Sequence, residues 1–180
     1  MLQFATQNYT ETLRWNDDPE EEKNEKAGEL MLGGNWQIAC KDAESIRESI
    51  WKLEEFLLTL PQVELPITHN FAGGIYAREM RAPAGACITG KIHKFEHINI
   101  LSKGSITVVT EHGLQYMQAP CTIISKPGTK RAGYAHEEVV WTSIHATKAT
   151  TVEEAEAELF TNDYGEYLTF FESLKLEKKQ

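Results

Sequence analysis

Two histidines that lie four residues apart, His93 and His97, are the side chains whose type and spacing best suit chemistry. A neutral imidazole binds divalent metals and also makes hydrogen bonds. Four residues of straight strand span about 13 Å, which is too far for both rings to reach one ion at about 2.1 Å. If the two side chains share a ligand, the chain must therefore turn at Lys94–Glu96.

The sequence around these histidines has the pattern of an antiparallel β-structure. From residue 70 onward, short runs rich in β-branched and aromatic residues alternate with turn residues roughly every 8–12 positions, as in a sandwich or barrel. The predicted strands are Ile75–Met80, Cys87–Ile92, His97–Leu101, Ile106–Thr110, Leu114–Gln118, Thr122–Ser125 and Val139–His145.

Helical patterns flank the predicted strands. Residues 43–60 repeat apolar side chains at three- and four-residue steps, from Ile46 to Leu57, which predicts an amphipathic helix. Its apolar stripe favours packing on a sheet, and a dimer contact is the alternative. Thr151 has the spacing of an N-cap for a second helix over Val152–Phe160.

We expect one domain in three parts: an acidic N-terminal extension over 1–66, a β-barrel over 67–147 and a C-terminal helical segment over 148–180. The run Asp17–Glu22 concentrates negative charge in the first part, and such runs are typical of solvated loops.

The composition favours a globular protein inside a cell. Hydrophobic residues make up 41% and charged residues 25%, which are globular values. A net charge of −9 disfavours general nucleic-acid binding, and no apolar run approaches the length of a membrane span. Because there is no secretory signal, the three widely spaced cysteines suggest reduced thiols and a cytoplasmic location. They are Cys40, Cys87 and Cys121.

The stretch from Gly85 to Gly104 resembles the first motif of the cupin superfamily. That motif runs Gly, five residues, His, one residue, His, three or four residues, Glu, six residues, Gly. In this sequence Lys91 stands in the first His position, His93 in the second, and His97 in the Glu position.

The stretch from Lys126 to Arg131 resembles the second cupin motif, Pro-x-Gly-x-x-His, with Arg131 where the last His belongs. The resemblance covers about residues 70–146. It implies a mainly β fold: the cupin double-stranded β-helix, or jelly-roll barrel, with the N-terminal and C-terminal helices packed outside.

Cupins commonly hold one metal with three His and one Glu, so the resemblance implies that His93 and His97 are metal ligands. His145 is a third candidate, because strand alternation turns it to the same face as Trp141 and Ser143. The sequence leaves two alternatives open. Either the site holds one divalent ion (Zn, Fe, Mn or Ni), or the histidines are hydrogen-bonded pocket residues of a cupin without a metal.

Cations occupy the other two metal-ligand positions, which disfavours an ion and favours an anionic ligand. Lys91 and Arg131 beside neutral imidazoles would suit a carboxylate or phosphate, with Arg131 able to bind it through two hydrogen bonds. Tyr76 and Trp141 could supply flat surfaces for a sugar or base.

Three functions follow from these candidates. The first is a small-molecule-binding cupin for an anionic metabolite, sugar phosphate or nucleotide. The second is a metal-dependent enzyme (an isomerase, epimerase, lyase or oxygenase) in which Glu96 or His136 transfers protons. The third is a dimeric protein-interaction module whose contact surface is the 43–60 helix and the acidic lead-in. We also expect a homodimer.

Residues 68–80 and 126–147 resemble cupin-like proteins carried by tailed phages. This resemblance implies expression in the cytoplasm of a bacterial host. In that setting the first function would be that of an accessory protein, or of a sponge that sequesters a host signalling nucleotide.

Overall fold

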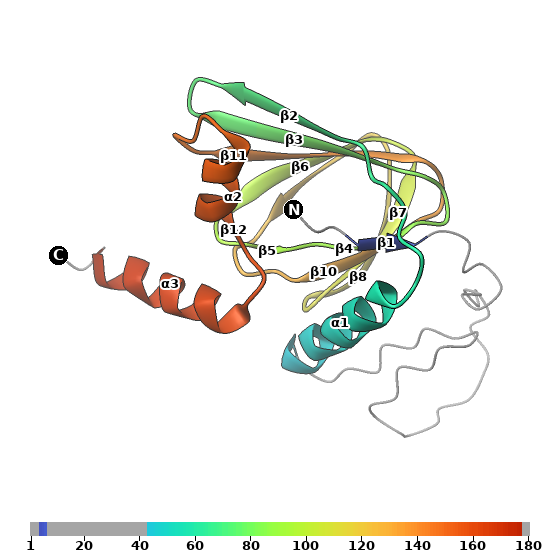
Figure 1. Ribbon diagram of the computed structural model, residues 1–180, viewed down its shortest axis with the longest axis horizontal. Helices are drawn as coiled ribbons and strands as arrows, with labels where there is room; N and C mark the ends of the chain where they lie inside the picture. Colours follow the sequence, from blue (N-terminus) through green and yellow to red (C-terminus); the bar gives the residue numbers. More distant parts are fainter. Residues whose placement is uncertain (1–3, 7–42, 178–180) are drawn as a thin grey trace.

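The computed structural model describes residues 4–6 and 43–177. Over these residues the chain forms two five-stranded antiparallel sheets that face each other, with helices on the outside (Figure 1). Most of the predicted 1–66 extension, including Asp17–Glu22, lies outside the described residues. In the described ranges, no helix has both the length and the apolar character that a membrane span requires.

The ten strands of the two sheets come from the whole described chain. Sheet one contains, in spatial order, β1 (Phe4–Thr6), β4 (Cys87–Thr89), β10 (Arg131–Ala135), β7 (Ser105–Thr110) and β8 (Gly113–Gln118). Sheet two contains β2 (Ile67–Ala72), β3 (Ile75–Ala82), β11 (Val139–Ala146), β6 (His97–Lys103) and β9 (Cys121–Ser125). A separate pair joins β5 (Ile92–His93) to β12 (Phe160–Thr161).

The order of the strands identifies the architecture. Without the edge strands β1 and β2, the sheets read β4-β10-β7-β8 and β3-β11-β6-β9. Numbered one to eight along the chain, these strands have the spatial orders 2-7-4-5 and 1-8-3-6, which is the double Greek key of a jelly roll. The predicted double-stranded β-helix is therefore confirmed.

All seven predicted strands are present, but one is interrupted, and four further strands of the described residues were not predicted. The predicted strand Cys87–Ile92 breaks at Gly90 and Lys91, which separate β4 from β5. Two of them, β1 and β12, are only three and two residues long. The other two are β2, an edge strand with mostly exposed residues, and β10, whose sequence RAGYA has low β-propensity. Pairing with two neighbours holds β10 in the sheet despite that composition.

The inner face of sheet two carries three cross-strand rows that change in character along the barrel. An apolar row comes first, then a polar row, then a row with two histidines. The rows are Met80–Trp141–Leu101, Arg78–Ser143–Asn99 and Tyr76–His145–His97. The apolar row packs with Ile88, Ile106 and Val108 of sheet one to form the main core. One end of the barrel is therefore an ordinary hydrophobic core, and the other end is polar.

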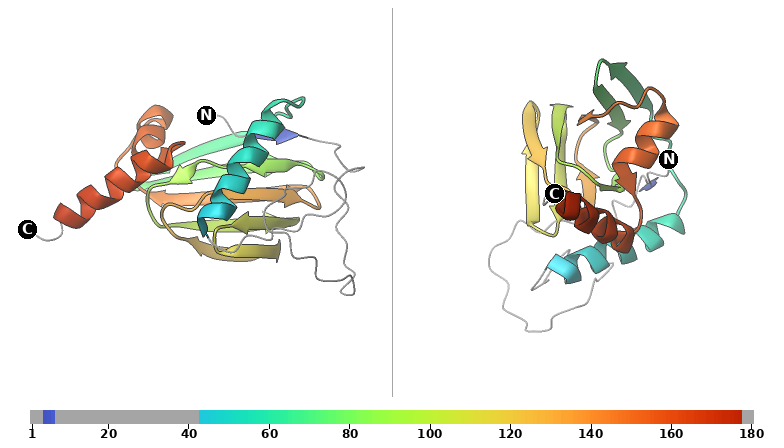
Figure 2. Two further views of the ribbon diagram at one scale, coloured as in Figure 1. Left: turned by 90° about the horizontal axis from the view of Figure 1, so that it is seen from below. Right: turned by 90° about the vertical axis from the view of Figure 1, so that its left-hand side faces the viewer.

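Helix α1 (Ala43–Leu58) covers the outer face of sheet one (Figure 2). Its apolar stripe buries Ile50, Leu53 and Leu57 against Cys87 and Ala132. The predicted helix and its packing on a sheet are confirmed. Because the stripe is covered, it is not available for the alternative role as a dimer contact.

Helix α2 (Val152–Leu159) lies at the end of the barrel that carries the histidines, and α3 (Tyr164–Glu177) extends away from that end (Figure 1). As predicted, Thr151 is the N-cap of α2, and its hydroxyl accepts a hydrogen bond from the Glu154 N–H. The helix ends one residue earlier than predicted, because Phe160 pairs as a strand with His93.

Candidate metal and anion site

The chain bends between the two histidines that the sequence singled out. Strand β5 ends at His93 and β6 begins at His97, and the three residues between them form a bend rather than a strand. The two ring centroids lie 4.1 Å apart, with the planes within 19° of parallel. The predicted turn is present, and it brings together two side chains that a straight strand would hold far apart.

The third predicted ligand, His145, joins them from β11. Its ring centroid lies 5.0 Å from that of His93 and 4.4 Å from that of His97. All three residues are buried, and each offers one ring nitrogen within 4.8 Å of the other two. We call His93, His97 and His145 the histidine triad.

Burial keeps the histidine triad uncharged. Desolvation lowers the pKa of His97 to about 4, although its hydrogen bond to the Phe95 carbonyl acts in the opposite direction. Desolvation, then the nearby His97, Arg78 and Arg131, lower the pKa of His145 to about 3. The pKa of His93 is also well below its usual value, again chiefly because of burial. At neutral pH all three imidazoles are therefore neutral, which is the form that binds a metal.

Four ring nitrogens of the triad lack hydrogen-bond partners among the described residues. His93 Nδ1, His97 Nε2 and both nitrogens of His145 are buried and have no partner within the described part of the chain. His97 Nδ1 lies 3.1 Å from the Phe95 carbonyl oxygen, which can only accept, so Nδ1 carries the proton and Nε2 carries a lone pair. A buried polar atom without a partner is costly. These atoms are therefore expected to have a ligand.

A divalent transition ion fits this donor set. Nitrogens that share an ion at about 2.1 Å lie at most about 4.2 Å apart, so side-chain movements of under about 1 Å would suffice. The second ring nitrogen of His97 is already fixed by a backbone carbonyl, as in many metal-binding histidines. The three histidines can therefore hold a metal ion.

The strand pair β5–β12 encloses the triad on one side. Phe160 pairs with His93, and the edge of its ring meets His93 at 4.7 Å and His145 at 5.3 Å between centroids. The Lys94 N–H donates to the Leu159 carbonyl at 2.8 Å. The end of α2 is thereby joined to the bend that carries the histidines.

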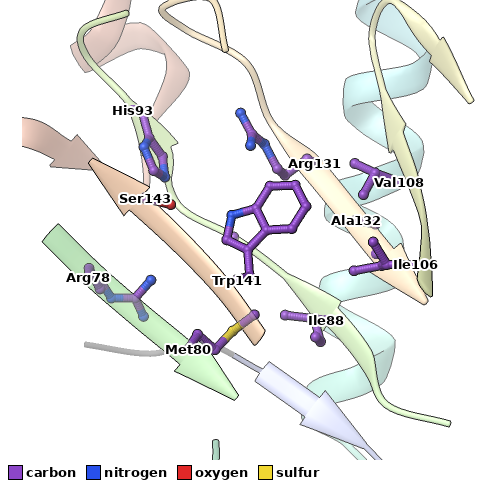
Figure 3. A pocket seen from close by; sticks show the side chains of 12 residues that line it. Arg78, Met80, Ile88, His93, Ile106, Val108, Arg131, Ala132, Trp141 and Ser143 are labelled. Carbon is purple, nitrogen blue, oxygen red and sulfur yellow. The ribbon is translucent and has the colours of Figure 1, made fainter. Parts of the chain in front are cut away.

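A cavity adjoins the triad at His93 and extends from the apolar row of the barrel to the polar row (Figure 3). It encloses about 60 Å³ and is lined by residues of both sheets. A single water needs roughly 10–15 Å³ by this measure, so the enclosed part holds a few waters or a small ligand. The polar and aromatic side chains that line it are those of Arg78, His93, Arg131, Trp141 and Ser143.

A hydrogen-bonded network fixes one wall of this cavity. The side-chain oxygen of Asn99 accepts from Trp141 Nε1 at 3.0 Å and from Ser143 Oγ at 2.6 Å, and its amide donates to Ser125 Oγ at 2.6 Å. All four residues are buried. Because its hydrogen bonds are satisfied, this polar layer holds Trp141 in place at low energetic cost.

Two of the predicted ligand-binding residues line the cavity and two do not. Arg131 and Trp141 face it (Figure 3). Lys91 instead forms an ion pair with Glu156 of α2 at 2.9 Å. It has the parity of Cys87, which packs against α1, whereas Ile88 and Gly90 line the cavity. Tyr76 is buried beside His145, and its hydroxyl lies 2.7 Å from His69 Nδ1, outside the cavity lining.

The structure does not bring the two predicted proton-transfer residues to the triad. The side chain of Glu96 is exposed in the bend. His136 is also exposed, and its Nε2 lies 2.7 Å from Thr107 Oγ1. It precedes β11, whereas His145 is near the end of that strand, so about 20 Å of strand separates them.

Sequence reasoning missed Arg78, which occupies the position expected for Lys91 as the second cation in the cavity. Its side chain is only 7% exposed. The signal was present, because Arg78 alternates with Tyr76 and Met80 on the inward face of a predicted strand. The sequence does not show which face of this strand lies inside the barrel, so the alternation alone could not place Arg78 in the cavity.

No protein-family model matches this sequence, and no curated protein gives a significant match. Among solved structures, the chain is similar to a cupin-like protein from Thermotoga maritima, with 14% identity, a TM-score of 0.41, and coverage of 52% of this chain and 83% of that one. A Cupin 2 conserved barrel domain protein from Salinispora arenicola gives 14% identity, a TM-score of 0.40, and coverage of 50% and 81%.

An acetylacetone dioxygenase from Acinetobacter johnsonii is similar at 16% identity, with a TM-score of 0.39 and coverage of 48% of this chain and 66% of that one. Likenesses at this level are too weak to transfer an activity. The strand order, rather than these likenesses, establishes that the chain has the double-stranded β-helix fold of the cupin type.

Proposed function

We propose that this protein binds one divalent transition-metal ion through His93, His97 and His145, and that the adjoining cavity takes a small anionic molecule. The observation that carries the proposal is the convergence of three buried, neutral imidazoles, each with at least one ring nitrogen that lacks a partner among the described residues. No hydrogen-bonding arrangement within the described chain satisfies these atoms, whereas one ion would satisfy a nitrogen of each ring.

The donor set restricts the choice of metal. Imidazole ligands suit Zn, Fe and Ni better than Mg or Ca, which prefer oxygen. Three protein ligands also leave coordination positions open, as catalytic zinc sites do. A bound ion would act as a Lewis acid toward an oxygen of the small molecule.

The lining of the cavity supports an anionic ligand. Arg78 and Arg131 are the charged residues that line it, and His93 is neutral. Among the residues that the structure describes, no Asp or Glu lines the cavity. Burial lowers the pKa of Arg131 to about 10, so its guanidinium stays protonated at neutral pH. The enclosed volume suits a carboxylate or phosphate group with a few further atoms. A nucleotide would enter with its phosphate end alone.

Binding is better supported than acid–base catalysis by side chains. Apart from the triad, the described lining residues include no group that exchanges protons readily at neutral pH, and Glu96 and His136 lie elsewhere. The proposal includes a role in sequestering a small anion inside a bacterial host, which is the setting that the resemblance to phage proteins implies.

Metal content tests the proposal directly. We expect the purified protein, after incubation with Zn²⁺ and removal of excess ion, to hold about one ion per chain by elemental analysis. His93→Ala and His145→Ala should each reduce the bound metal at least tenfold, because two remaining ligands form a weak site. His112→Ala, at an exposed histidine in the β7–β8 turn, is the matched control and should retain the ion. Equal retention by folded triad variants, checked by circular dichroism, would contradict the proposal.

A further inference from the structure

The histidine triad supplies three neutral donors and no negative charge. In the part of the chain that the structure describes, no Asp, Glu or Cys joins these three histidines in a group that could hold an ion. The carboxylate that cupin resemblance would lead one to expect is replaced by His97 itself. A divalent ion held here would therefore keep its full double positive charge.

Two guanidinium groups increase this positive charge. Arg78 and Arg131 both line the cavity next to the triad, and both point into it (Figure 3). After burial and His97, the positive charge of Arg131 also lowers the pKa of His93, and Arg78 adds a smaller effect. The negative charge of Glu111 raises the pKa of Arg131 and so counteracts part of the effect of burial, but Glu111 does not line the cavity. An ion and two arginines in one small space need a negatively charged ligand.

Arg131 has a donor available for that ligand. Its Nε is buried and has no hydrogen-bond partner within the described residues. The orphaned donor of Arg131 and the orphaned acceptors of the triad thus lie at the same end of the barrel interior. The cavity that Arg131 and His93 both line encloses about 60 Å³.

We infer that a small dianion completes the metal site: one of its oxygens binds the ion, another binds Arg131, and the ion and the anion therefore bind cooperatively. The inference rests on the proposed function, because it requires an ion in the triad. Each ligand offsets a charge that the other would otherwise leave uncompensated, so each must raise the affinity for the other by the same factor.

The size of the cavity defines the chemical class of the anion. A short dicarboxylate and inorganic phosphate both carry a double charge on few atoms, and both present oxygens to a metal and to a guanidinium. A monocarboxylate such as acetate carries a single negative charge, so it offsets less of the positive charge of the ion and Arg131. We therefore use malonate, inorganic phosphate and acetate as probes.

The experiment measures the affinity of the full-length protein for Zn²⁺ by equilibrium dialysis and elemental analysis, with and without each probe. We expect malonate or phosphate to tighten Zn²⁺ binding at least tenfold, and acetate to change it less than about threefold. Because free malonate and phosphate compete for Zn²⁺ in solution, their competition opposes tightening and cannot produce it. Tightening by one of the two dianions alone supports the inference and identifies the class of anion.

Two variants locate the second contact. Arg131→Met removes the guanidinium and keeps an apolar side chain of similar length, so it should retain Zn²⁺ but lose most of the tightening by the dianion. Arg81→Met is the matched control, because Arg81 is exposed and pairs with Glu79 on the outside of β3. It should show the same tightening as the unaltered protein.

The outcomes separate the two levels of the proposal. If the triad holds no Zn²⁺ with or without a dianion, the proposed function fails. If it holds Zn²⁺ with the same affinity in malonate, phosphate and acetate, the inference alone is overturned. This comparison uses the unaltered protein, so it decides the matter even if Arg131→Met does not fold.

Discussion

His97 and His145 show how burial, rather than residue type, decides what an imidazole can do. On the surface a histidine titrates near pH 6.5 and is partly charged in the cell. Desolvation lowers the pKa of His97 to about 4 and that of His145 to about 3. A side chain that would serve as a pH switch on the surface is thereby converted into a permanently neutral donor.

This burial should make the metal-free protein less stable in acid. Below about pH 6.5 the unfolded chain binds protons on its histidines, whereas His97 in the folded protein binds one only near pH 4. The unfolded state binds more protons between about pH 4 and about pH 6.5. The free energy of unfolding should therefore decrease as the pH falls through this range, and should reach its full value above about pH 6.5. His97 alone contributes on the order of 3 kcal/mol.

Urea denaturation of the metal-free protein at about pH 4.5 and about pH 7 measures this difference. His97→Gln removes one of the titrating groups and should make the dependence on pH shallower. The interpretation fails if the variant and the unaltered protein lose the same free energy of unfolding over this range.

At the scale of elements, the site depends on connections that change the direction of a strand. The bend after β5 brings His93 to His97, and the turn from β6 to β7 moves the chain from one sheet to the other at Gly104. Gly104 has a φ of +78°, and a Cβ atom there would collide with the backbone carbonyl of Glu138. This position therefore requires glycine for two reasons, conformation and space.

Replacing Gly104 with alanine should destabilise the barrel strongly. Gly113, in the β7–β8 turn, is the matched control, because it also has a positive φ of +116° but has open space where a Cβ would lie. We expect Gly104→Ala to lower the free energy of unfolding by at least about 2 kcal/mol more than Gly113→Ala. Thermal or urea unfolding measures the difference, and equal losses would show that the collision with Glu138 is unimportant.

At the scale of the whole molecule, one ion pair joins helix α1 to the barrel. Lys130, 1% exposed, pairs with Glu54 of α1 and lies 5.2 Å above the ring of Trp51. Together with the buried apolar stripe of α1, this contact holds the helix against sheet one. The apolar stripe is therefore not available to the predicted interaction module, whose acidic lead-in lies outside the described residues, and the predicted homodimer stays a prediction.

Breaking this ion pair should cost more than breaking one on the surface. Lys130→Met leaves Glu54 without its partner and should lower the free energy of unfolding by about 3 kcal/mol. Adding Glu54→Leu should recover much of that loss, because both charges are then absent. Lys103→Met removes an exposed partner of Glu138 and should change the free energy of unfolding by less than about 1 kcal/mol. Similar losses for Lys130→Met and Lys103→Met would contradict this view of α1.

The sequence by itself determined the features that depend on local pattern. Alternation and turn spacing predicted seven strands, apolar periodicity predicted α1, and the four-residue step from His93 to His97 required a bend if the two shared a ligand. These features could be predicted because neighbouring residues determine them. Strand β10 could not, because its partners in the sheet hold it there rather than its own propensity.

The tertiary structure alone decided which charged side chains face the cavity. Lys91 and Arg78 are both cations in β-rich segments, yet Lys91 pairs with Glu156 of a helix 65 residues away, and Arg78 is buried in the barrel. Which face of a strand is inside depends on where strands break and on what packs against them, and both are settled by contacts between residues distant in sequence.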